Sequence, residues 1–102
     1  QIKLDTPAGN SLVMDESGKS VKITDQNNNS ITMDTSGIKI DSPKNIDINA
    51  QVNLTLKAGA TLSIGGVTIS VKADGNVSME GAMAKLAGQG MTEISGGMVK
   101  IN

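Results

Sequence analysis

Short triplets whose first and third residues are apolar recur along the whole chain. Such an alternation with a period of two predicts β-strands that bury one face and leave the other in water. The triplets are Ile2-Lys3-Leu4, Leu12-Val13-Met14, Val21-Lys22-Ile23, Ile31-Thr32-Met33, Ile38-Lys39-Ile40, Ile46-Asp47-Ile48, Leu54-Thr55-Leu56, Leu62-Ser63-Ile64, Ile69-Ser70-Val71 and Val77-Ser78-Met79. Only Val13 is an apolar middle residue, and hardly any window fits a helix. The pattern therefore predicts an all-β protein.

The first part of the chain has the spacing of successive hairpins. Up to Ile31 the triplets begin nine or ten residues apart, and turn-forming tetrads separate them. These tetrads are Pro7-Ala8-Gly9-Asn10, Glu16-Ser17-Gly18-Lys19 and Gln26-Asn27-Asn28-Asn29. Residues of these types favour the tight turns that join antiparallel strands. We therefore expect residues 1–37 to form a short β-meander.

From Ile38 onward the triplets begin only seven or eight residues apart. Such a step is too short for a hairpin return, so the chain is expected to turn a corner and keep winding. Small or turn-forming residues lie at the expected corners: Gly59, Gly65-Gly66, Asp74-Gly75-Asn76, Gly81, Gly88 and Gly96-Gly97. We therefore expect residues 38–102 to form a triangular β-helix, or β-prism, whose faces are strands of about eight residues.

One copy of the chain is too short to complete such a prism. Three faces of eight residues make about 24 residues per turn, so a single chain would form fewer than three coils with open sheet edges. The absence of Phe, Tyr and Trp suits a narrow axial core. We therefore expect an intertwined homotrimer in which folding and association are one event. Its core is predicted to contain Ile38, Ile40, Ile46, Ile48, Leu54, Leu56, Leu62, Ile64, Ile69, Val71, Val77 and Met79.

Composition removes several function classes. The chain has no His and no Cys, which leaves out the usual general base and the usual transition-metal ligands. Nine basic and ten acidic residues are spread along it, and without aromatic side chains it offers no platform for nucleic acid. The Asp-rich turns at 15–18, 34–37 and 74–76 match neither an EF-hand loop nor the glycine–aspartate nonapeptide of calcium-binding β-rolls. We expect no catalytic residue, no metal, no cofactor and no nucleic-acid partner.

Two stretches carry a resemblance to a known family. Thr6-Pro7-Ala8-Gly9-Asn10 with the strands up to Gly37-Ile38-Lys39-Ile40, and the ending Gly96 to Asn102, resemble the carboxy-terminal spike of the valine–glycine-repeat (VgrG) proteins of type VI secretion systems. Central spikes of contractile phage tails are related. The resemblance implies a trimeric needle that pierces a target envelope, is assembled in the bacterial cytoplasm and is then ejected. In the family, hub and binding-fold domains precede such a spike, so they are expected before Gln1.

The resemblance also implies a partner at the last residues of the chain. Family members commonly carry a conical tip protein with a proline–alanine–alanine–arginine (PAAR) repeat. Its binding residues would be Gly97, Met98, Val99, Lys100, Ile101 and Asn102. Three copies of the last triplet would form a blunt apolar end, which such a protein would cover.

Two other functions remain open from the sequence. A trimeric phage tail fibre or adhesin stalk would bind a surface receptor through its outward face, although no exposed aromatic or Arg cluster marks such a surface. A monomeric solenoid that binds ice would carry regular outward rows of Thr. The outward positions instead mix Lys, Asp, Ser and Thr.

Overall fold

The computed structural model describes residues 1–102, which divide into two compact units, Gln1–Lys57 and Ala58–Asn102. The first unit contains all the paired strands, and no helix occurs anywhere in the chain. The strands are β1 (Ile2–Asp5), β2 (Ser11–Asp15), β3 (Ser20–Thr24), β4 (Ser30–Asp34) and β5 (Gly37–Asp41). The predicted all-β class is therefore confirmed.

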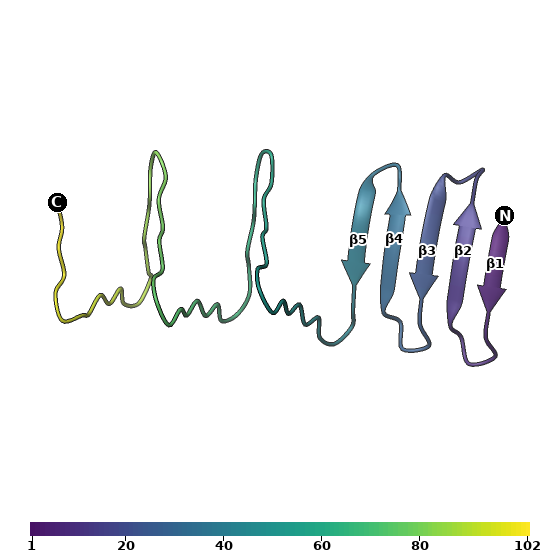
Figure 1. The fold of residues 1–102 in the computed structure, drawn as a ribbon, viewed down its shortest axis with the longest axis horizontal. Helices are drawn as coiled ribbons and strands as arrows, with labels where there is room; N and C mark the ends of the chain where they lie inside the picture. The colour runs from purple at the N-terminus through teal and green to yellow at the C-terminus, as the bar shows by residue number, and fades with distance from the viewer. The chain divides into compact units, whose positions relative to one another are not determined.

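The five strands form one antiparallel sheet in chain order, so β1 and β5 are its two open edges (Figure 1). The register aligns the apolar positions of all five strands. Leu4, Leu12, Ile23, Ile31 and Ile40 form one row across the sheet, and Ile2, Met14, Val21, Met33 and Ile38 form a second. Because side chains alternate along a strand, both rows lie on the same side, which we call the apolar face.

Local turn chemistry explains why the strands return as hairpins. In the turn between β1 and β2, the N–H of Gly9 donates to the carbonyl of Thr6 at 3.1 Å, and Gly9 has a φ of 109°. In the turn between β3 and β4, the N–H of Asn28 donates to the carbonyl of Asp25 at 3.2 Å, and the φ of Asn28 is 68°. Gly and Asn tolerate these positive φ angles, so the predicted tetrads do form the turns.

Beyond Asp41 the chain is extended and forms no strand pair within itself. It bends at 43–44, 51–52, 59–60, 67, 74–75, 82–83, 89–90 and 97, which is once every seven or eight residues. Each apolar triplet from Ile46 onward lies between two of these bends or after the last one, and every predicted corner glycine lies at a bend or within two residues before one. The local path therefore has the predicted step. The triangular trimer itself stays a prediction.

The last strand bears on the expected boundary between residues 37 and 38. β5 contains Ile38 and Ile40, and both are paired with β4 through Met33 and Ile31. The two residues therefore continue the meander within one chain. The division of the chain after residue 37 stays a prediction, because the β-helix would begin where strands of different copies pair, and the structure contains one copy.

Candidate functional site: an uncovered apolar face

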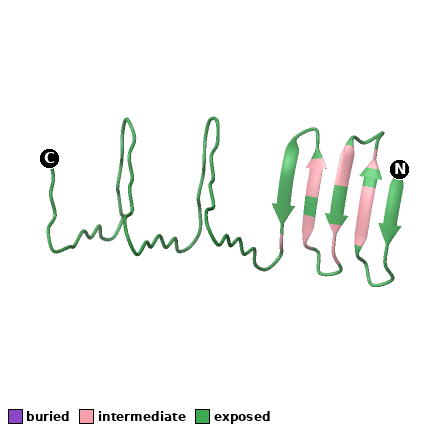
Figure 2. Ribbon diagram, viewed as in Figure 1, coloured by how far each residue is buried: buried purple, intermediate pink, exposed green.

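The apolar face is the most prominent surface of the first unit. All of its residues are exposed or half-buried, and no residue of the chain is buried (Figure 2). Even Ile31, at the centre of one row, keeps 38% of its surface exposed, and Ile38 on the edge strand keeps 72%. A contiguous patch of this kind on a soluble protein marks an interaction surface.

The solvent-accessible surface area of the chain also shows that little of it is buried. The chain exposes 10186 Å². A compact monomer of 10.4 kDa would expose roughly 5,400 Å² by the usual size scaling. The excess is far larger than the area of about 800 Å² that each partner contributes to a standard protein interface. A single copy therefore lacks a core and leaves its apolar side chains accessible to solvent.

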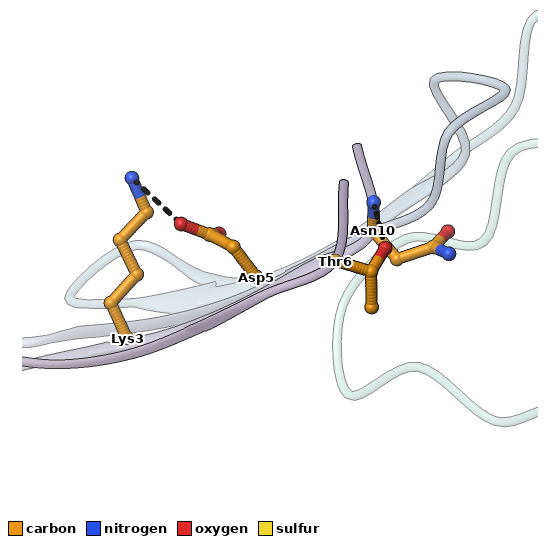
Figure 3. A network of polar contacts seen from close by, with 4 residues as sticks. All are labelled: Lys3, Asp5, Thr6 and Asn10. Carbon is orange, nitrogen blue, oxygen red and sulfur yellow. Dashed lines mark hydrogen bonds and ion pairs between the residues drawn. The ribbon is translucent and has the colours of Figure 1, made fainter. Parts of the chain in front are cut away.

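The opposite side of the sheet is mostly polar, and each of its two edge strands carries an ion pair there. Lys3 and Asp5 of β1 form an ion pair with 3.5 Å between Nζ and Oδ2, and their side chains lie on the same side of the strand (Figure 3). Lys39 and Asp41 of β5 form an equivalent pair, also at 3.5 Å. Exposed pairs of this type add little stability. Charged side chains on edge strands do discourage random edge-to-edge association.

A network of polar contacts organises one end of the sheet. Oδ1 of Asp25 accepts hydrogen bonds from the N–H groups of Asn27 and Asn29, each at 2.9 Å, and Oδ2 accepts one from the side-chain amide of Asn29 at 2.9 Å. The side-chain amide of Asn29, followed by its backbone N–H, lowers the pKa of Asp25 from 3.8 to about 2. The hydroxyl of Ser42 donates to Oδ1 of Asn29 at 2.6 Å. The network thereby fixes the point at which the chain leaves β5.

Close backbone approaches explain some of the corner glycines in the second unit. A Cβ at Gly88 would lie 2.6 Å from the carbonyl oxygen of Met91, and one at Gly81 would lie 3.2 Å from the carbonyl oxygen of Met83. Both glycines directly precede a bend. Any side chain at Gly88 would force the backbone to shift, so glycine at this corner is a steric requirement.

The predicted core residues form no buried core within one chain, although Ile40 and Ile46 line one open hollow with Ile23 and Ile31. Ile38 and Ile40 belong to the apolar face, whereas all the others lie on the extended segments beyond β5 and are exposed. The predicted tip residues, 97–102, are exposed as well, with Met98 and Ile101 each at 85%. Neither set is tested by the structure of one chain, and both stay predictions.

Sequence reasoning leaves eight members of the apolar face out of the predicted core. These are Ile2, Leu4, Leu12, Met14, Val21, Ile23, Ile31 and Met33. The sequence could have identified them, because their triplets show the same apolar–polar alternation as the triplets of the predicted core. The alternation predicts a sheet with one buried face there, but it does not identify what covers that face.

No group of three or more acidic, His or Cys side chains gathers in a way that would hold a metal ion. A hollow of about 520 Å³ follows the row from Ile2 to Met33, but it is shallow and open to solvent. No helix of the chain has the length and apolar character needed to cross a membrane.

These features define an all-β protein whose sheet has one exposed apolar face. Residues 1–71 match the family of the phage baseplate V C-terminal trimerisation domain, and the chain therefore belongs to this family. A comparison with curated proteins finds no match. Membership in a trimerisation domain family supports the predicted homotrimer and a structural, phage-tail-like spike role. It is also consistent with the expectation that the chain is not an enzyme.

Proposed function

We propose that this chain is the piercing spike at the tip of a contractile injection machine, of the VgrG type found in type VI secretion systems. The observation that carries the proposal is the uncovered apolar face, continued by extended segments that bend every seven or eight residues. Three copies winding around one axis would cover these surfaces at once. Backbone hydrogen bonds between chains along the whole rod would make unfolding slow and resist axial load.

The first test is the solution mass of the chain, measured by light scattering after size exclusion, before and after heating. We expect the mass of three chains, retained after heating. Leu56→Asp would place three carboxylates near the axis and is expected to abolish the trimer. Ser63→Asp, at the polar middle position of the next triplet, is the matched control and is expected to assemble. A monomer mass for the unchanged chain, or a trimer from Leu56→Asp, would contradict this proposal.

The spike is proposed to carry a PAAR-repeat tip protein on residues 97–102. Met98 and Ile101 support this, because both are apolar, highly exposed and close to the last bend. We expect a PAAR-repeat protein to co-purify with the chain and to be lost with Met98→Asp. Ser95→Asp is the control, since it adds the same charge at a polar position. If the trimer instead bound a cell-surface receptor and no tip protein, a tail fibre or adhesin stalk would be the better interpretation.

We further propose that the spike is assembled in the bacterial cytoplasm and ejected into the target cell or the medium. Epitope-tagged chain should then appear in the medium only when the contractile sheath is intact. Its appearance in a strain without a sheath would contradict this route.

A further inference from the structure

Three methionines occupy equivalent corners of the second unit. Met83, Met91 and Met98 each lie at a bend or directly after one. In each corner a preceding glycine approaches the backbone carbonyl oxygen of the methionine. From this oxygen an added Cβ would lie 3.2 Å away at Gly81, 2.6 Å away at Gly88 and 3.3 Å away at Gly96. A similar local path therefore recurs three times, and it brings a methionine to the same place each time.

Alternation along the chain places these methionines on its polar side. Residues two apart in an extended segment share a side. Met83 therefore shares its side with Lys85. Met91 likewise shares its side with Glu93. Met79 differs, because it is the third residue of the triplet Val77-Ser78-Met79 and so belongs to the apolar side.

Earlier segments carry polar residues at the corresponding place. Two residues before the middle residue of each triplet between 46 and 79, the sequence has Asn45, Asn53, Thr61, Thr68 and Asn76. Asn and Thr suit a side that faces water, whereas a methionine on that side gains no packing from the apolar side. The change from Asn and Thr to Met is confined to the last three segments. These sulfur atoms are therefore a local chemical feature of the polar side.

We propose that Met83 and Met91 are surface oxidation sites of the assembled spike, which a hydroperoxide converts to methionine sulfoxide. The proposal rests on the trimer of the proposed function. The sulfur lone pair attacks one peroxide oxygen and the O–O bond breaks. With hydrogen peroxide the second oxygen leaves as water, so the thioether is oxidised and the peroxide is reduced. Met98 has an equivalent place but lies among the residues proposed to bind the tip protein, so it reacts only where no tip protein covers it.

Assembly is what separates the two kinds of methionine. Within one chain Met79 is 84% exposed and Met83 is 89% exposed, so a single copy offers both sulfur atoms to an oxidant. Burial of the apolar side in the trimer would shield Met79, together with Met14 and Met33 of the apolar face. The sulfur atoms on the polar side would stay accessible. A sulfoxide is polar and disrupts no packing on a side that faces water, so we expect the oxidised trimer to persist.

Peptide mass spectrometry of the chain treated with dilute hydrogen peroxide tests the proposal. Trypsin releases residues 73–85 as one peptide, which contains both Met79 and Met83, and fragmentation locates the added oxygen atom. The rate at each methionine is divided by the rate at the same residue in denaturant. We expect Met83 and Met91 to react nearly as fast as in denaturant. Met79 should react at least about tenfold more slowly, since oxidation of a covered sulfur requires local opening.

Two variants test the assignment of sides without an oxidant. Met83→Asn/Met91→Asn introduces the residue type found at this place in earlier segments, and light scattering should still give the mass of three chains. Met79→Asn is the matched control, because the same change on the apolar side should lower the thermal stability of the trimer. A loss of the trimer in Met83→Asn/Met91→Asn would contradict the assignment.

The outcomes separate this proposal from the trimer itself. Equal relative rates at Met79 and Met83 in a chain of trimeric mass would overturn the proposal and leave the proposed function standing. Slow oxidation of Met83 and Met91 in such a trimer would have the same consequence. Monomeric mass, with every methionine reacting as it does in denaturant, would overturn both.

Discussion

The backbone N–H of Gln26 donates a hydrogen bond of 2.9 Å to Oδ1 of Asn10, and these residues belong to two different turns. Both turns lie at the end of the sheet where Asp5, Ser11, Thr24, Ser30 and Asp41 align. Ser42 bonds to Asn29 at the same end. The strands are therefore held together by their turns as well as by their pairing, in a sheet that has no packed core of its own.

Replacing Asn10 tests how much this link contributes. Asn10→Ala removes the acceptor and should lower the free energy of unfolding by about 0.5–1.5 kcal/mol, the usual net value of one hydrogen bond. Asn10→Asp keeps an acceptor oxygen and should retain most of the stability. Chemical denaturation at equal chain concentration measures both, since assembly makes stability depend on concentration. Equal losses in the two variants would show that the oxygen is not what matters.

The turn organised by Asp25 predicts a dependence on acid. Its pKa is lowered to about 2 by the hydrogen bonds from Asn29 and Asn27, so the fold favours the carboxylate over the protonated form. The stability that this carboxylate contributes is fully present above about pH 4 and is lost as the pH falls toward 2. The difference in melting temperature between the unchanged chain and Asp25→Asn should therefore shrink as the pH is lowered from 4 toward 2. A constant difference between them at every pH would contradict the assignment.

The apolar face predicts opposite effects for two neighbouring residues of β4. Ile31 lies in an apolar row, whereas Thr32 lies on the other side of the sheet beside Lys22 and Lys39. Ile31→Asp should prevent trimer formation, because it places uncompensated carboxylates where apolar surfaces meet. Thr32→Asp should assemble normally and change stability by less than about 0.5 kcal/mol. Light scattering of the two variants decides between them. A trimer from Ile31→Asp would show that this face stays open.

The meander was predictable because its determinants are local. Alternation fixes which residues share a face, and the turn residues near Gly9 and Asn28 fix where each strand reverses. The pairing of Ile31 in β4 with Ile40 in β5 follows from these two facts. The bends beyond Asp41 were predictable for the same reason, since the corner residues lie next to them in the sequence.

Contacts between distant residues escaped prediction. The bonds from Gln26 to Asn10 and from Ser42 to Asn29 depend on which turns meet in space, and the composition of each turn does not reveal it. The boundary of the meander at 37 stays a prediction, because Ile38-Lys39-Ile40 has the same pattern whether its partner is β4 or a strand of another copy. One chain has no core for the same reason. The apolar rows show which side chains are available for burial, but they do not show which residues would pack against them.

The corner at Gly88 offers a stringent test of the winding path in the second unit. A methyl group added at Gly88 would meet the carbonyl oxygen of Met91 at 2.6 Å, whereas nothing lies within 4 Å of a Cβ at Gly90, two residues later. Gly88→Ala should therefore cost about 1–3 kcal/mol, the usual range for a forced backbone shift. Gly90→Ala should lower the free energy of unfolding much less. Thermal unfolding of the two variants compares them at the same bend, and a larger loss from Gly90→Ala would mean that the corner is built differently in the assembled spike.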